Sequence, residues 1–312
     1  MAKKPKILIL SNDLKKGGIE KIILNSISFL NDNQYVTDLY LLNNIIQYKS
    51  YDYSKFKIFF ALKKRKINFF LLIFKINKFF NKLKTYNIVI SHHDFSNYLN
   101  IISTFLFSKH KSIIVLHTYP KFYFYNQKNI IGYLKYKIHK YFQKIIYRFA
   151  HEIIVISNDL KNYVTKEIKK KSTLIYNPLI DSNRHINKNK NFINKKFVTI
   201  GTLTKRKNQI SILKTFNDLN RSGFIKNNNL TLEIIGEGDE YSNLNNYIKK
   251  NNLKDFVKIK KNYENLEEIY SKSFCLISAS ILEGIPNVFI EALSYNLPII
   301  SSDIPAAFEI LE

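Results

Sequence analysis

Residues 283–303 read Glu-Gly-Ile-Pro-Asn-Val-Phe-Ile-Glu-Ala-Leu-Ser-Tyr-Asn-Leu-Pro-Ile-Ile-Ser-Ser-Asp, with seven residues between Glu283 and Glu291. Pro286 is compatible with the first turn of a helix and Pro298 ends that helix, so Glu283 precedes it and Glu291 lies within it. The apolar run that begins at Pro298 predicts a short strand. A loop, a helix and a strand in this order are typical of an α/β domain.

The same alternation of short apolar runs and helix-period stretches extends over the rest of the chain, as in parallel sheets with crossover helices. The predicted strands are residues 7–10, 35–42, 88–91, 112–116, 152–156, 172–176, 197–200, 230–235, 257–259, 274–277 and 298–301. Apolar spacing predicts helices over residues 19–30 and 133–149. A polar stretch rich in Asn and Lys then predicts two Rossmann-like domains, 1–180 and 197–312, joined by a linker at 181–196.

In such a two-domain α/β protein, ligands bind at the carboxyl ends of strands, here in a cleft between the domains. Because Glu283 and Glu291 are separated by the loop-to-helix junction, we expect them to face different parts of a ligand. They are suited to the sugar and ribose hydroxyls of a nucleotide-sugar, with the backbone amides near Asn287 and Val288 on its phosphates. The alternative is a surface acid followed by an ordinary helix glutamate.

Charge is distributed unevenly along the 312 residues, whose formal net charge is +25. Residues 53–151 carry nineteen Lys or Arg and one acid, Asp94, although an AT-rich genome also produces many Lys and Asn residues. The single cysteine, Cys275, lies in an apolar run and is expected in the core, so a reducing cytoplasm is favoured. The run Ile7–Leu10 is too short for a signal peptide, and no run is long enough to span a membrane.

A basic, aromatic stretch lies at residues 55–86, and two interpretations of it are open. Aromatic side chains in a lipid interface with Lys and Arg on anionic head groups would attach the protein to the inner face of the cell membrane. Alternatively, the aromatic residues fill the core. The phenylalanines of the stretch are Phe56, Phe59, Phe60, Phe69, Phe70, Phe74, Phe79 and Phe80. Basic and aromatic residues also accompany nucleic-acid binding, but no nucleic-acid-binding module is present, so this alternative is disfavoured.

The segment from Ser280 to Pro286, together with Glu291-Ala292-Leu293, resembles the signature of the retaining family-4 glycosyltransferases, the glycosyl transferases group 1. Further segments that resemble this family follow the family's order. They are residues 154–157, 175–178, 201–209 and 232–239. The resemblance implies a GT-B fold of two Rossmann-like domains facing an interdomain cleft.

The resemblance also implies an activity. It is the transfer, with retention, of a hexosyl or N-acetylhexosaminyl group from a nucleoside diphosphate sugar, expected to be a UDP-sugar. The acceptor is expected to be lipid-linked or a surface glycan, as in bacterial lipopolysaccharide or capsule synthesis. No metal or other cofactor is expected, because fixed cations and helix termini stabilise the departing diphosphate.

The implied site residues come from both domains. Glu283 and His117 are the candidate catalytic residues, and His117 ends a predicted strand, as do His92 and His93. The family usually has an arginine directly after the glycine of residues 201–209, where this chain has Thr202, and Arg206 is the candidate replacement. The candidate donor-binding residues are Gly17, Gly18, Arg206, Lys207, Gly236, Gly238, Pro286, Asn287, Val288 and Glu291.

Simpler explanations of these residues are a solvated basic loop at Lys205-Arg206-Lys207, plain turns at the glycines and structural histidines at strand ends. The chain ends at Glu312, shortly after the last predicted strand, whereas relatives usually continue through several more elements. A truncated, inactive relative that binds only nucleotide-sugar is therefore a further alternative.

Overall fold

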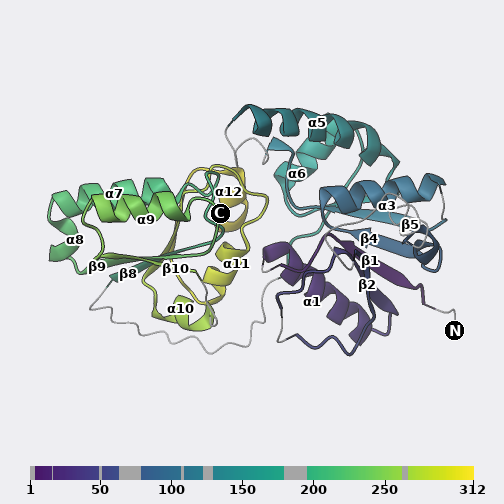
Figure 1. Cartoon of the computed structure of the whole chain (residues 1–312), viewed down its shortest axis with the longest axis horizontal. Coiled ribbons are helices and arrows are strands. Elements are labelled where there is room, and N and C mark those ends of the chain that lie inside the picture. Colours follow the sequence, from purple (N-terminus) through teal and green to yellow (C-terminus); the bar gives the residue numbers. More distant parts are fainter. Residues whose placement is uncertain are drawn as a thin grey trace. The chain divides into compact units, whose positions relative to one another are not determined.

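The computed structural model describes residues 4–15, 17–48, 51–62, 79–106, 109–121, 129–178, 195–261 and 266–312 (Figure 1). The chain divides into two compact units. One comprises Met1–Tyr119 and Ile138–Asn177, and the other Pro120–Lys137 and Pro178–Glu312. The predicted linker at 181–196 lies outside the described residues, except for Lys195 and Lys196, which begin a strand.

The first unit is built on a parallel sheet in the order β3-β2-β1-β4-β5-β6-β7. Its strands are β1 Ile7–Ser11, β2 Thr37–Asn43, β3 Ile58–Leu62, β4 Ile88–Ser91, β5 Lys111–Leu116, β6 Glu152–Val155 and β7 Thr173–Leu174. Six of them match predicted strands, because their apolar runs are short and clearly bounded. Strand β3 was not predicted. It lies at the sheet edge, half-buried, within the basic aromatic stretch.

Helices cover both faces of this sheet, with α1 on one face and α3 on the other in Figure 1. Helix α1 buries Ile23, Leu24 and Ile27 against Leu39 and Leu41 of β2, as its apolar spacing predicts. The predicted helix at 133–149 is also found, as α5 followed by a short 3-10 turn, and the residues of α5 up to Lys137 belong to the second unit. The helical elements are α1 Gly18–Asp32, α3 Asp94–Leu106, α5 Ile130–Ile146, η1 Tyr147–Phe149, α6 Asn158–Tyr163 and η2 Val164–Ile168.

Five of the eight phenylalanines in the stretch 55–86 are among the described residues, and none of the five is exposed. Phe56, Phe79 and Phe80 are buried, and Phe59 and Phe60 are half-buried against the core. The expectation that these five aromatic rings meet lipid is therefore wrong, because burying them stabilises the fold. Phe69, Phe70 and Phe74 lie outside the described residues.

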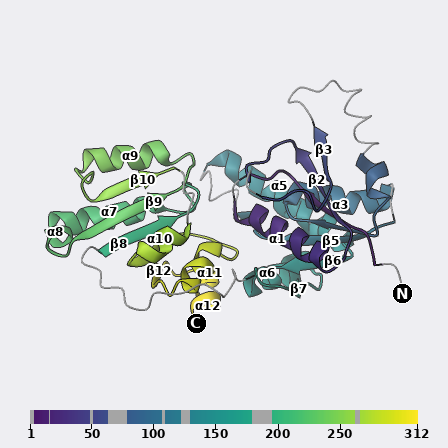
Figure 2. The ribbon, with the colours of Figure 1, turned by 90° about the horizontal axis from the view of Figure 1, so that it is seen from below.

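The second unit has a parallel sheet in the order β10-β9-β8-β11-β12. Its elements are β8 Lys195–Ile200, α7 Gln209–Arg221, α8 Phe224–Asn227, β9 Leu230–Ile235, α9 Tyr241–Lys250, β10 Val257–Lys260, α10 Leu266–Lys272, β11 Cys275–Ser278, α11 Asn287–Ser294, β12 Ile299–Ser301 and α12 Pro305–Leu311. Figure 2 shows the same strands from a second direction. All five match predicted strands. Cys275 is buried, and burial raises the pKa of its thiol to about 11, as expected of a core residue.

Both sheets reverse their strand order at one point, between β1 and β4 in the first unit and between β8 and β11 in the second. Loops after neighbouring strands diverge at such a point and leave a crevice in which α/β proteins bind ligands. Several predicted site residues follow these strands: Gly17 and Gly18 follow β1, Arg206 and Lys207 follow β8, and Glu283 follows β11. Among the described residues, no helix combines the length and apolar character that crossing a membrane requires.

Candidate functional site

An ion cluster lies at the order reversal of the second unit. Glu283 lies after β11. Its Oε1 is 2.5 Å from Lys207 Nζ, and its Oε2 is 2.9 Å from Arg206 Nη1. Ser280 Oγ donates to Glu283 Oε1 at 2.9 Å, and Arg206 Nη1 also donates to the carbonyl of Leu282 at 2.7 Å. All three charged side chains are almost fully buried. The structure thus brings together three predicted residues from two loops.

The Glu283 carboxylate is held in its ionised form. Burial by itself raises the pKa of this carboxyl, but Lys207, Arg206 and the hydrogen bond from Ser280 outweigh burial and leave the pKa below its usual value. The cluster therefore keeps two cations and one anion at the strand ends. The simpler explanation of residues 205–207 as a solvated loop is wrong for Arg206 and Lys207, whose side chains are 10% and 14% exposed.

Glu291 has different surroundings, as its place within a helix predicts. It lies buried in α11 and accepts a hydrogen bond from Tyr270 Oη at 2.8 Å. The Tyr270 ring stacks on Tyr295, with ring centroids 5.5 Å apart. The helix begins at Asn287, with Pro286 before it, so the amides of Asn287 and Val288 lie at its N-terminus.

Two glycines of the second unit are required by close backbone packing. Gly236 and Gly238 have φ of +152° and +156°, and a Cβ on them would collide with the backbone of Gly201 and Leu203 respectively. Gly201 has φ of +149° and lies under the Lys207 side chain, whose Cε would be 3.3 Å from an added Cβ. The two loops therefore support each other and position Lys207. This packing is sufficient to explain why glycine occupies positions 236 and 238.

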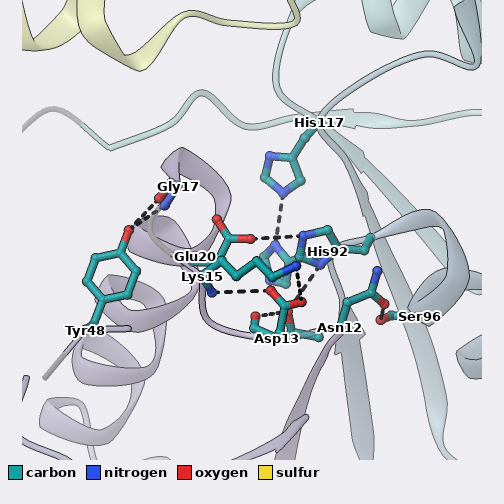
Figure 3. Close-up of polar contacts among 11 residues, drawn as sticks. Asn12, Asp13, Lys15, Gly17, Glu20, Tyr48, His92, Ser96 and His117 are labelled. Carbon is teal, nitrogen blue, oxygen red and sulfur yellow. Dashed lines mark hydrogen bonds and ion pairs between the residues drawn. The ribbon is translucent and has the colours of Figure 1, made fainter. Parts of the chain in front are cut away.

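Histidines form the centre of the corresponding region in the first unit (Figure 3). His92 follows β4 and His117 follows β5, and their Nδ1 and Nε2 atoms lie 3.0 Å apart. Burial lowers the pKa of His117 to about 3 and that of His92 well below its ordinary value. Both rings are therefore neutral at pH 7, and one donates the hydrogen bond that the other accepts.

Three further residues contact this region, and the sequence did not single them out. Glu20, in the first turn of α1, has its Oε1 3.3 Å from His93 Nε2, and Ser11 Oγ lies 3.2 Å from His93 Nδ1. Tyr48 Oη accepts from Gly17 N at 3.0 Å and donates to Gly17 O at 2.6 Å. The sequence signal that could have identified Glu20 is an acidic residue in the first turn of a helix that follows a strand. Gly18 begins α1, so the glycine pair lies at a helix N-terminus.

Within the described ranges, no three His, Cys, Asp or Glu side chains gather in a way that could hold a metal ion.

Comparison with known proteins identifies related sequences. Residues 182–312 match the family model described as Glycosyl transferases group 1. An uncharacterized glycosyltransferase of Methanocaldococcus jannaschii is 31% identical over 252 residues, which are 74% of this chain and 58% of that protein. An alpha-1,4-N-acetyl-D-galactosaminyltransferase of Campylobacter jejuni, named for a substrate on PP-undecaprenol, is 30% identical over 173 residues. These are 55% of this chain and 46% of that protein.

Among solved structures, HepE of Anabaena in complex with UDP and glucose has a TM-score of 0.78 with this chain. The match covers 99% of this chain and 83% of HepE, at 15% sequence identity. At that identity the likeness shows a shared fold. The chain spans about half the length of the curated relatives given above.

Proposed function

Because residues 182–312 belong to the glycosyl transferases group 1 and the chain has the expected GT-B fold, we propose that it transfers a sugar from a nucleoside diphosphate donor. UDP-sugar is the proposed donor class. This choice is supported by HepE, which has the same fold and whose structure was determined in complex with UDP and glucose.

The observation that carries the proposal is the buried cluster of Glu283, Arg206 and Lys207 at the order reversal of the second sheet. A departing diphosphate gains negative charge, and fixed cations stabilise it without reorganisation. Lys207 and Arg206 supply these cations. Glu283 holds them in position in the absence of donor and is the proposed partner of the donor-sugar hydroxyls.

The remaining donor contacts are assigned by position. Glu291 is the proposed partner of the ribose, and the amides at the start of α11 and the loops at Gly236 and Gly238 are proposed to lie along the phosphates and the nucleoside. From the first unit, Gly17 and Gly18 at the start of α1 are proposed phosphate contacts. His117 is the proposed contact to the donor sugar. The reaction needs no metal ion in this proposal, because cations and helix termini supply the positive charge.

A lipid-linked or surface-glycan acceptor and retention at the anomeric carbon complete the proposal. The substrate in the name of the Campylobacter jejuni relative supports a lipid-linked acceptor. An acceptor in the membrane requires the enzyme at the bilayer surface, so we place the protein on the inner face of the cell membrane. The basic composition of residues 1–194, with 34 Lys or Arg and 10 Asp or Glu, supports attachment to anionic lipid.

Thermal-shift measurements with UDP-, GDP- and ADP-sugars test the donor. We expect UDP-sugar to raise the melting temperature most. Lys207→Ala should lose the part of the shift that UDP adds over uridine, and Glu291→Ala should lose the nucleotide-dependent shift. Lys214→Ala, an exposed lysine of α7, is the matched control. If Lys207→Ala responds to UDP as Lys214→Ala does, the diphosphate site is not at this cluster. A donor shift without sugar transfer to any acceptor would instead support the alternative of nucleotide-sugar binding alone.

A further inference from the structure

Helix α5 leaves most of its apolar side chains exposed and fully buries the polar Gln143, whereas an ordinary surface helix turns its apolar side toward the core. Four of the apolar side chains of α5 in the first unit are 43% to 64% exposed. They are Ile138, Tyr141, Phe142 and Ile145. Their spacing of three and four residues places them on one side of the helix. These four residues, with Phe149 of η1, are named the α5 outer face.

The opposite side of α5 is held to the unit by polar contacts. Gln143 is fully buried, donates to Asp94 Oδ1 of α3 at 2.9 Å and accepts from Tyr163 Oη of α6 at 3.1 Å. Lys140 pairs with Glu167 of η2 at 2.8 Å. The orientation of the helix is therefore specified by polar contacts, and the outward direction of its apolar side is a consequence of them.

The apolar surface continues beyond the helix. Phe149 is 54% exposed, and its ring contacts Phe105 at the end of α3, with ring centroids 5.2 Å apart. Phe105 and its neighbour Leu106 are also exposed. Contiguous exposed apolar residues of this kind mark an interaction surface, whereas scattered single ones do not.

The charge of the sequence segment that contains the α5 outer face identifies the kind of partner. Residues 95–151 contain no Asp or Glu. Their nine basic residues are Lys109, Lys111, Lys121, Lys128, Lys135, Lys137, Lys140, Lys144 and Arg148. Residues 195–312 carry 15 Lys or Arg and 14 Asp or Glu, so the lysine-rich composition of the whole chain does not explain a segment without acids. We therefore expect a partner that offers both apolar groups and negative charge.

We propose that the α5 outer face docks on an anionic lipid bilayer. The apolar side chains of the α5 outer face enter the interface between head groups and acyl chains, while the exposed lysines Lys135, Lys137 and Lys144 meet the lipid phosphates. A second copy of this chain fits less well, because pairing two such faces brings lysines against lysines. This inference rests on the membrane attachment in the proposed function and replaces the stretch 55–86 as the attached surface, but it is independent of donor binding.

Co-sedimentation of the full chain with vesicles tests the docking. The vesicles contain phosphatidylcholine alone or with phosphatidylglycerol, and neither donor nor acceptor is present. We expect binding only to the anionic vesicles. Ile138→Ser with Ile145→Ser should abolish it. Lys137→Gln with Lys144→Gln should weaken it about thirtyfold, since each lysine near an anionic surface contributes about 1 kcal/mol.

Matched controls come from exposed residues elsewhere. Phe29→Ser on α1, at a side chain 68% exposed, and Lys249→Gln with Lys250→Gln on α9 should bind like the wild type. Melting temperatures equal to the wild type show that the variants are folded. Equal binding by the α5 variants and these controls, or a dimer in solution that the isoleucine variant dissociates, would overturn the proposal. Because no substrate is present, this result is separate from the thermal-shift test of the donor site.

Discussion

The two units place different chemistry at the same position in their sheets. At the order reversal of the first unit, the neutral rings of His92 and His117 contact each other. At that of the second unit, Glu283 is surrounded by Arg206 and Lys207. The glycines differ too. A Cβ added at Gly236 would collide with backbone atoms, whereas a Cβ added at Gly17 would meet only a side chain. The comparison shows a buried ion cluster at the reversal in the second unit. In the first unit, neutral histidine rings lie beside the pairs of Glu20 with His93 and of Asp13 with Lys15.

Removing the charge of Glu283 should have the largest effect. In Glu283→Gln, the buried cations Arg206 and Lys207 lose their anion, and we expect the free energy of unfolding to fall by about 3–5 kcal/mol. Urea unfolding measures this change. Glu268→Gln breaks the exposed pair with Lys272 and should leave the free energy of unfolding almost unchanged. Equal losses in the two variants would contradict a preorganised buried cluster.

Because these histidines are buried in the neutral form, we expect the free energy of unfolding to depend on pH. His92, His110 and His117 have pKa values lowered by burial, to about 4 for His110 and about 3 for His117, from an ordinary value of 6.5. Below pH 6.5 the unfolded chain therefore binds protons that the folded chain does not, and the free energy of unfolding falls as pH falls.

Unfolding measured from pH 6.5 to about pH 5 isolates this effect, because carboxyl groups with ordinary pKa values titrate at lower pH. Replacing both His92 and His117 by Gln should remove about 3 kcal/mol of the decrease over this range. The part of the decrease in the free energy of unfolding that is due to His110 should persist in the double variant. An unchanged dependence on pH would show that the first unit does not bury its two histidines in the neutral form.

The glycines of the second unit should tolerate a side chain poorly. Gly236→Ala forces a φ of +152° on an alanine and drives its Cβ into the backbone carbonyl of Gly201, so we expect a loss of about 2 kcal/mol or more. Gly223→Ala is the control, because its φ is +75° but only Asn227 Nδ2 lies near, at 4.0 Å. It should cost about 1 kcal/mol. Chemical unfolding distinguishes the two, and a smaller loss for Gly236→Ala than for Gly223→Ala would show that the loops can separate.

Gly17→Ala should have the smallest effect. Gly17 has φ of −167° and ψ of 168°, an extended conformation that any residue adopts. The added Cβ meets only the flexible end of the Glu20 side chain, so the free energy of unfolding should change by about 0.5 kcal/mol or less. Thermal unfolding of this variant beside Gly236→Ala compares the two loops directly. A loss as large as that of Gly236→Ala would contradict an adaptable loop in the first unit.

The fold was largely predictable, because strands and helices follow from local apolar spacing. Eleven predicted strands correspond to observed strands, and α5 with η1 occupies the predicted helix at 133–149. Strand β3 was missed because Phe59 and Phe60 lie in a basic stretch that also has the composition of a lipid-binding surface. Composition cannot distinguish a buried phenylalanine from an exposed one, and the packing of neighbouring elements decides between them.

The site was predictable as a set of candidate residues but not as a set of contacts. The separation of Glu283 from Glu291 follows from the helix start at Asn287, which Pro286 indicates in the sequence. The bonds from Tyr270 to Glu291 and from Glu20 to His93 join segments whose spacing contains no signal of contact. The roles proposed for these residues in donor binding remain predictions.

The amino-acid sequence by itself determined the alternation of strands and helices, the buried cysteine and the residues available at strand ends, because each depends on neighbours a few positions away. The tertiary structure alone decided that Glu283 meets Arg206, that Gly236 packs on Gly201 and that the apolar side of α5 faces outward. These contacts depend on which strands lie side by side and on which face of a helix is anchored. That arrangement is a property of the whole packed unit, so local patterns do not contain it.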